Sequence, residues 1–322
     1  MRFFFIFSVG VIVHGDLTNI ALEENACGVK GLPVEFTIPD PFNVITVGPQ
    51  LAETDASYIC KVQRHPNLLI KIEHRKSWLN NSLFDEARIM KEIESLLIAP
   101  KVYWEGAIVD KPVLVFEFLD GQTLWDYYLA ISTEFPATWK DMLIQKAIEQ
   151  IQMLRILHED GGYIHGDTHA NNWIVLPSGE LKLIDFGRSI KVGDRAAAQA
   201  RAASYVPPLD WMLSPWDLEG QPLDRREDIF RVVINLSNML TEGEVPRFYI
   251  AMNDSPADCK FHKRSSDLFD PPKPSGALSG LVQKLKLRVR PPYDEIIALL
   301  EALKEIPKTA ADEEASPPAA LV

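Results

Sequence analysis

The sequence predicts an α+β protein with two lobes, a small β-rich N-terminal lobe and a larger helical C-terminal lobe, with a cleft between them. The chain has 322 residues, and 47% of them are hydrophobic, which is enough to build a sizeable core. Strand patterns dominate over residues 44–119, and helical patterns dominate over residues 120–305. This change of hydrophobic period sets the expected boundary between the lobes.

Five runs of β-branched and apolar residues predict the strands of the N-terminal lobe. They lie at residues 44–47, 58–62, 68–72, 102–109 and 113–118. Between the third and fourth runs, apolar residues recur at helical spacing over residues 83–97, with charged residues between them. One helix is therefore expected to interrupt the sheet.

Helices are expected to make up most of the C-terminal lobe. A long helical pattern covers residues 139–158, and a Gly-Gly pair follows it as a stop signal. A hairpin with a Pro-Ser-Gly turn is expected over residues 173–184. Further helical patterns cover residues 226–240, 277–287 and 292–304. The tail at residues 306–322 is rich in proline, alanine and acidic residues, so we expect it to be disordered.

The overall charge and the cysteines limit the classes of protein that fit this sequence. The chain has 33 Lys and Arg against 45 Asp and Glu, for a net charge of −12, which argues against binding to nucleic acid or to anionic membranes. Its three cysteines, Cys27, Cys60 and Cys259, lie far apart and form no CxxC pair. Ordinary reduced thiols are therefore expected.

Two interpretations of the N-terminus stay open. An apolar run at residues 3–13 follows Arg2 and precedes His14 and Gly15, an outline typical of a secretory signal. The run is too short to span a bilayer, so no stable membrane span is expected. Residues 1–20 are either a signal peptide or an extra strand of the N-terminal sheet, and the location is correspondingly the secretory pathway or the cytoplasm.

The strongest chemical signal is a pair of short motifs. His-Gly-Asp-Thr-His-Ala-Asn-Asn covers residues 165–172, and Asp-Phe-Gly covers residues 185–187 after the next predicted strand. Phosphoryl transfer needs a carboxylate that orients the attacking hydroxyl, and oxygen ligands that hold Mg²⁺ against nucleotide phosphates. Asp167, Asn172 and Asp185 supply that set. Either motif alone is common turn chemistry, but the two in this order are specific.

In order and spacing, the two motifs resemble the catalytic loop and the metal-binding triplet of the protein kinase superfamily. The resemblance implies a bilobal kinase-like fold with ATP and Mg²⁺, or Mn²⁺ in its place, as cofactors. It also implies that Asp167 is the catalytic base, that Asn172 holds one metal, and that Asp185 chelates the metal at the terminal phosphates. The loop is atypical, because Gly166 and His169 stand where a typical serine/threonine kinase has arginine and lysine.

A lysine and a glutamate upstream extend the resemblance. Lys71 ends an apolar strand pattern, and a lysine on a buried strand needs a counter-charge. By resemblance, Lys71 reaches the α- and β-phosphates and pairs with Glu86 on the following helix. Lys61 competes for this role, and an exposed edge position is the alternative for Lys71.

The resemblance implies that two further segments contact the nucleotide. Kinases have a glycine-rich loop over the phosphates, and this chain places Ala52, Thr54 and Ser57 at the glycine positions. These residues are small, but they lack the positive-φ freedom of glycine, which argues for weaker nucleotide binding. The strand at residues 113–118 resembles the hinge that meets adenine, so Glu117 and Leu119 are expected at that contact.

The resemblance continues through the C-terminal lobe. Asp228, at the start of the helix over residues 226–240, is implied to hold the catalytic-loop backbone, and favourable helix-end electrostatics is its simpler explanation. Residues 205–208 resemble the end of an activation segment, and Arg290 resembles the entry to the final helix. One kinase-like domain is therefore expected at residues 44–305, with its lobes at 44–119 and 120–305.

Three functions stay open on the sequence alone. The Asp-Phe-Gly triplet and the downstream resemblances favour a protein kinase acting on serine or threonine of a protein substrate. Gly166 and His169 instead resemble small-molecule kinases of the aminoglycoside and choline type. The altered phosphate loop favours a third function, a catalytically weak pseudokinase that acts as a binding scaffold. Without arginine at position 166, activity is not expected to need phosphorylation of Ser189 or Ser204.

Overall fold

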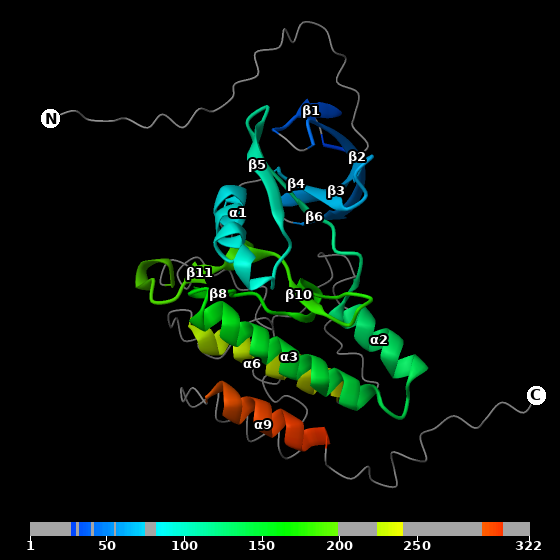
Figure 1. Cartoon of the computed structure of the whole chain (residues 1–322), viewed down its shortest axis with the longest axis vertical. Helices are drawn as coiled ribbons and strands as arrows, with labels where there is room; N and C mark the ends of the chain where they lie inside the picture. Colours follow the sequence, from blue (N-terminus) through cyan, green and yellow to red (C-terminus); the bar gives the residue numbers. More distant parts are fainter. Residues whose placement is uncertain are drawn as a thin grey trace, which may run out of the picture.

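A β-rich N-terminal lobe lies above a helical C-terminal lobe in the computed structural model, as the sequence predicts (Figure 1). The structure describes residues 27–29, 32–39, 42–54, 56–74, 82–198, 224–240 and 292–304. Several predicted features lie outside these ranges, namely the first 20 residues, residues 205–208, the helix at 277–287, Arg290 and the tail at 306–322.

The described part of the N-terminal lobe is built on a six-stranded antiparallel sheet with the order β1-β2-β3-β4-β6-β5. Its strands are β1 (Glu35–Thr37), β2 (Val44–Glu53), β3 (Ser57–Gln63), β4 (Leu68–Glu73), β5 (Val102–Ile108) and β6 (Lys111–Glu117). The five predicted strands are all present. Strand β1 extends the sheet upstream of residue 44, where we expected the domain to begin.

Strand β4 lies inside the sheet, between β3 and β6. Every residue from Leu68 to Ile72 is buried, which explains why this strand is a nearly continuous apolar run rather than an alternating one. Lys71 is the charged residue in that run, and it is only 7% exposed. The sheet therefore buries an ammonium group that requires counter-charges nearby.

Helix α1 (Leu83–Glu92) follows β4 and packs against β5 and β6 (Figure 1). The Ser82 hydroxyl caps its first turn by accepting a hydrogen bond from the backbone N–H of Asp85. The predicted end at residue 97 is wrong. Ile93 already leaves helical geometry, a 3₁₀ turn follows, and Leu97 has a left-handed φ of 58°. The apolar pattern continued past the helix because Ile93 is buried after it ends.

The C-terminal lobe is organised around a long central helix. Its described helices are α2 (Leu124–Glu134), α3 (Trp139–Glu159), α6 (Arg225–Leu240) and α9 (Tyr293–Lys304). Short strands on the cleft side are β7 (Gln122–Thr123), β8 (Tyr163–Ile164), β9 (Trp173–Val175), β10 (Leu181–Leu183) and β11 (Ile190–Lys191). The predicted hairpin at 173–184 is present as the β9–β10 pair. No described helix is both long and apolar enough to cross a membrane.

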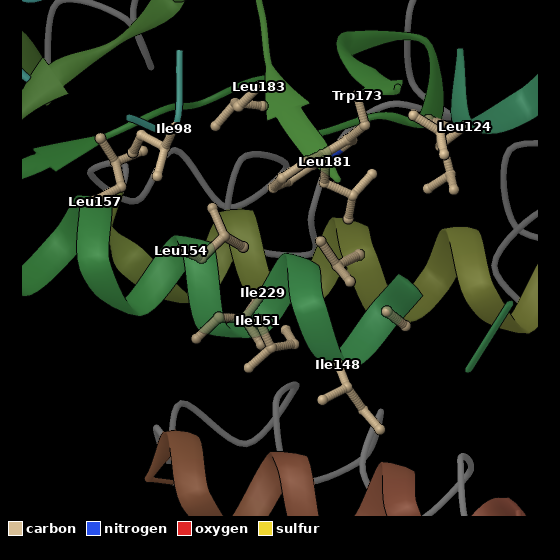
Figure 2. Close-up of a cluster of buried hydrophobic side chains, with 14 of the residues drawn as sticks. Ile98, Leu124, Ile148, Ile151, Leu154, Leu157, Trp173, Leu181, Leu183 and Ile229 are labelled. Atoms are coloured by element: carbon tan, nitrogen blue, oxygen red, sulfur yellow. The ribbon is translucent and has the colours of Figure 1, made fainter. Parts of the chain in front are cut away.

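Helix α3 lies at the centre of the main hydrophobic core, in contact with α6 and α9 (Figures 1 and 2). Its apolar side chains recur at helical spacing, and Ile151, Leu154 and Leu157 are fully buried. Figure 2 shows Leu154 and Leu157 on the side of the helix that faces the β9–β10 hairpin, where Leu181 lies. This packing supports the β9–β10 hairpin from the side of α3.

Two cysteines are paired in the structure, so the expectation of reduced thiols is wrong for them. Cys27 and Cys60 form a disulfide with a Cα–Cα distance of 5.9 Å, and both are buried in the N-terminal lobe. The pairing joins residues 33 apart in sequence and crosses from the segment before β1 to strand β3. Sequence spacing could not reveal it, because contacts between distant segments depend on the sheet order. Such bonds are typical of oxidising compartments.

The assigned core predicts that replacing a buried leucine costs more stability than replacing an exposed one. Leu154→Ala removes a side chain with 0% exposure and should lower the free energy of unfolding by about 2–5 kcal/mol. The matched change Leu129→Ala, on α2 where the side chain is 44% exposed, should cost at most about 0.5 kcal/mol. Urea denaturation of both variants checks this, and equal costs would contradict the assigned core.

Candidate active site

The catalytic-loop motif lies between β8 and β9 and is held by one buried carboxylate. Asp228, on the first turn of α6, has 0% exposure. Its Oδ2 accepts the backbone N–H of His165 at 2.7 Å, and its Oδ1 accepts that of Gly166 at 2.8 Å. Gly166 has φ = +76°, a left-handed conformation that glycine adopts without strain. The predicted contact of Asp228 with the loop backbone is therefore present.

Asp228 has further support from two other helices. His158 of α3 contacts its Oδ2 through Nε2 at 2.8 Å, and the other ring nitrogen of His158 contacts the hydroxyl of Tyr293 on α9. Burial alone would raise the pKa of Asp228, but the hydrogen bonds from His158 and from the His165 backbone outweigh it and lower that pKa. Asp228 thus stays ionised, as its role as a double acceptor requires.

Asp167 points into a group of cationic and imidazole side chains. Arg231 Nη1 on α6 lies 3.3 Å from Asp167 Oδ1, and Arg188 Nη1 lies 3.8 Å from the same oxygen. His169 Nε2 lies 3.8 Å from the other oxygen, Oδ2. Asp167 itself is 9% exposed. These contacts favour one orientation of the carboxylate.

Lys71 connects the two lobes through a pair of carboxylates. Its Nζ lies 2.8 Å from Glu86 Oε2 on α1 and 3.1 Å from Asp185 Oδ1 in the C-terminal lobe. Burial would lower the pKa of Lys71, but the charges of Asp185 and Glu86 outweigh it and raise that pKa. Lys61 is exposed and lies over the Phe118 ring instead. The structure therefore brings Lys71, not Lys61, to the predicted glutamate.

Asp185 and Asn172 offer oxygen atoms suited to a magnesium ion. Asp185 adopts a left-handed backbone (φ = 63°), and its side chain is 37% exposed. Lys71 helps to lower its pKa against the opposing effect of burial, so the carboxylate is ionised. The Asn172 amide nitrogen donates to the Asp167 carbonyl at 2.8 Å, which leaves the amide oxygen as its ligand atom.

This donor set fits Mg²⁺ held mainly by nucleotide. Mg²⁺ usually takes one or two protein oxygens and completes its shell with phosphates and water. The described residues contain no group of three or more His, Cys, Asp or Glu side chains that could hold a metal. Asp185 and Asn172 would hold the ion, and neutralisation of phosphate charge is the chemistry it would supply.

The hairpin between β2 and β3 carries Ala52, Thr54 and Ser57. Thr54 Oγ1 accepts the backbone N–H of Ser57 at 3.0 Å and lies 3.4 Å from the backbone nitrogen of Ala56. The Thr54 N–H in turn donates to the Ser57 carbonyl. Backbone donors that a glycine-rich loop would offer to phosphates are therefore satisfied within the hairpin. Ser57 is buried, whereas Ala52 and Thr54 are exposed.

Glu117 and Leu119 lie where the chain leaves the sheet for the C-terminal lobe. Glu117 is the last residue of β6 and pairs with Leu68 of β4. Its side chain accepts the backbone N–H of Lys101, so the carboxylate is directed at the neighbouring strand end. Leu119 follows beyond the last ladder pair, which places its backbone at the predicted hinge.

The sequence did not indicate Arg188 and Arg231 as site residues. Both lie within 4 Å of Asp167 Oδ1. The signal for Arg231 was present, because it follows Asp228 by three residues on a helix and therefore shares its face. For Arg188 the sequence carried no comparable signal, since its direction depends on the 3₁₀ turn Phe186–Arg188.

Comparison with known proteins shows that this chain is similar in sequence to protein kinases. Serine/threonine-protein kinase PknB of Mycobacterium tuberculosis is 30% identical over 171 residues, which cover 53% of this chain and 25% of PknB. Lymphokine-activated killer T-cell-originated protein kinase of Homo sapiens is 24% identical over 200 residues, 61% of either chain. The chain thus spans about a quarter of PknB and less than two thirds of the human relative.

A solved structure shares the fold of this chain, and a family model matches its sequence. The crystal structure of the BubR1 kinase domain matches 89% of this chain and 87% of its own, with a TM-score of 0.57 at 17% identity. Residues 66–268 match the protein kinase domain family, and this match begins after the β2–β3 hairpin. Because the match covers well over half of the chain, the chain belongs to the protein kinase domain family.

Proposed function

We propose that this chain is an ATP-dependent protein kinase that transfers the γ-phosphate to a serine or threonine hydroxyl of a protein substrate. The observation that carries the proposal is the Lys71 ammonium between Glu86 and Asp185, in a chain whose Asp167 carboxylate is held by Arg231. This arrangement supports the proposal because it brings together side chains that suit a phosphate-binding cation, a metal ligand and a base. The serine/threonine kinases among the relatives support the acceptor class.

Each of these residues has a defined task in the proposed reaction. Lys71 binds the α- and β-phosphates, and Glu86 keeps its ammonium directed into the cleft. Asp167 orients the acceptor hydroxyl and takes its proton. Bound Mg-ATP supplies the γ-phosphoryl group, which bonds to the acceptor oxygen as the bond to the bridging oxygen breaks and ADP leaves with that electron pair.

The closed β2–β3 hairpin favours one alternative, a weakly catalytic scaffold. Internal hydrogen bonds at Thr54 compete with phosphate for the same backbone donors. Lys71 keeps its contacts with Glu86 and Asp185, so we expect weakened rather than abolished nucleotide binding. A small-molecule acceptor is the other alternative, and product identity separates it from a protein acceptor.

The primary test is transfer of labelled γ-phosphate from Mg-ATP to a mixed protein substrate. Asp167→Asn should lower transfer by roughly 10²- to 10⁴-fold, because it removes the base. Asp185→Asn should also lower transfer, through loss of metal binding. The matched change Asp110→Asn, in the β5–β6 turn, should have no effect. Label in small molecules alone would support the small-molecule alternative, and neither transfer nor Mg-ATP binding would support the scaffold.

Freeing the hairpin donors should strengthen nucleotide binding. Thr54→Gly removes the hydroxyl that accepts from residue 57 and adds positive-φ freedom, so we expect the Kd for Mg-ATP to fall about tenfold. Thr54→Val removes the hydroxyl alone and should produce part of this gain. Calorimetric titration with Mg-ATP measures both. An unchanged or weaker affinity in Thr54→Gly would refute the competition between the hairpin and phosphate.

Activity should not depend on phosphorylation of Ser189. Its hydroxyl donates to the His165 carbonyl at 3.1 Å and the residue is 2% exposed, so a phosphate there would displace the catalytic loop. We expect full activity after phosphatase treatment, and in the Ser204→Ala variant. Ser189→Asp should lose activity. A gain in transfer on phosphorylation of either serine would contradict this expectation.

A further inference from the structure

Helix α6 presents one polar face to the catalytic loop. Asp228, Arg231 and Asn235 follow one another at intervals of three and four residues, so they lie on the same side of the helix. Asp228 holds the loop backbone, as described above, and Asn235 Nδ2 donates to the Thr168 carbonyl at 3.3 Å. Arg231 Nη1 donates to Asp167 Oδ1 at 3.3 Å. The same face therefore contacts both the backbone of the loop and its reactive carboxylate.

The guanidinium of Arg231 is itself held in place. Its side chain is 8% exposed, and its Nε donates at 2.7 Å to Oε1 of Glu227, one helical turn earlier, whose side chain is 3% exposed. A planar guanidinium donates from two edges at fixed angles, unlike the ammonium of lysine. The pairing with Glu227 thus sets the direction in which the other edge reaches Asp167.

The two oxygens of Asp167 consequently have different surroundings. Oδ1 is contacted by Arg231, and Arg188 lies farther away at 3.8 Å. Oδ2 lies 3.8 Å from His169 Nε2. The Nδ1 atom of His169 accepts the Asn171 N–H, so the proton of the neutral ring is on Nε2.

We propose that Arg231 is a positioning residue for the transfer reaction, which holds Oδ1 of Asp167 from below the loop and thereby presents Oδ2 to the acceptor hydroxyl. The inference rests on the proposed kinase function. In this arrangement Arg231 acts on the reaction through its contact with Asp167. Removal of Arg231 leaves Oδ1 of Asp167 with the more distant Arg188, at 3.8 Å, and so loosens the productive orientation of the carboxylate.

A purely structural role is the competing explanation, because a buried arginine paired with Glu227 could serve stability alone. The two explanations differ in what they require of Asp167. A structural role changes the unfolding midpoint and the amount of folded enzyme, but not the turnover of the folded fraction. A positioning role lowers kcat, leaves the KM for ATP unchanged, and disappears when Asp167 is already replaced.

The test compares Arg231→Gln and Arg231→Lys with the unmodified chain, each with and without Asp167→Asn. We expect Arg231→Gln to lower kcat roughly 10²-fold with no change in the KM for ATP, as a misplaced reacting group does. Arg231→Lys keeps the buried charge but not the two-edge geometry, so its kcat should be intermediate. In the Asp167→Asn background neither change should lower the residual rate further. Arg155→Gln, which breaks only the exposed pair with Asp294, is the matched control.

Each contrary result has a distinct meaning. A kcat for folded Arg231→Gln equal to that of the unmodified chain, or a further loss in the Asp167→Asn background, overturns the positioning role while the kinase function stands. If Arg231→Gln does not fold, Arg231→Lys decides, and full kcat in that variant overturns the proposal. Absence of transfer by the unmodified chain overturns the proposed function itself. In that case the unfolding midpoints still test the contact between Arg231 and Asp167. If the shifts caused by Arg231→Gln and Asp167→Asn simply add in the double variant, the two side chains do not interact.

Discussion

The ionised, fully buried carboxylate of Asp228 is the constraint on which the geometry of the site depends. A buried carboxylate must be supplied with hydrogen-bond donors, and here the donors are the backbone N–H groups of His165 and Gly166 and the ring of His158. Supplying them forces the catalytic loop into one path over α6. The same carboxylate links α3 and, through Tyr293, α9 to the loop. The position of Asp167 follows from that path.

A second set of charges couples the lobes. Lys71 belongs to the N-terminal sheet, yet one of its two carboxylate partners, Asp185, belongs to the C-terminal lobe. Helix α1 also contacts that lobe through Glu92, its last residue. The Tyr163 hydroxyl donates to Glu92 Oε2 at 2.6 Å, and Lys191 Nζ lies 3.4 Å from the same oxygen. Contacts near both ends of α1 therefore hold the helix in place.

The sequence predicted the site where spacing alone determines geometry. Strand and helix periods located the elements, and resemblance to the protein kinase superfamily pointed to Asp167, Asn172 and Asp185, whose roles stay predictions. The directions of side chains were harder to predict from the sequence. Arg231 could have been inferred from helical spacing after Asp228, but its choice of Asp167 as partner depends on how α6 packs below the loop. The Cys27–Cys60 pair depends on strand order, which no local pattern encodes.

The balance of buried charges argues for retained chemistry despite the closed hairpin. Lys71, Glu86, Arg231 and Glu227 are all less than 10% exposed, and apolar residues of similar volume could often replace such groups at no cost to stability. A scaffold that only binds partners would gain little from keeping them. Two of the three departures from the glycine pattern in the β2–β3 hairpin, Ala52 and Thr54, are exposed. Weakened nucleotide binding with an intact reaction centre is therefore a more economical explanation of this chain than complete loss of catalysis.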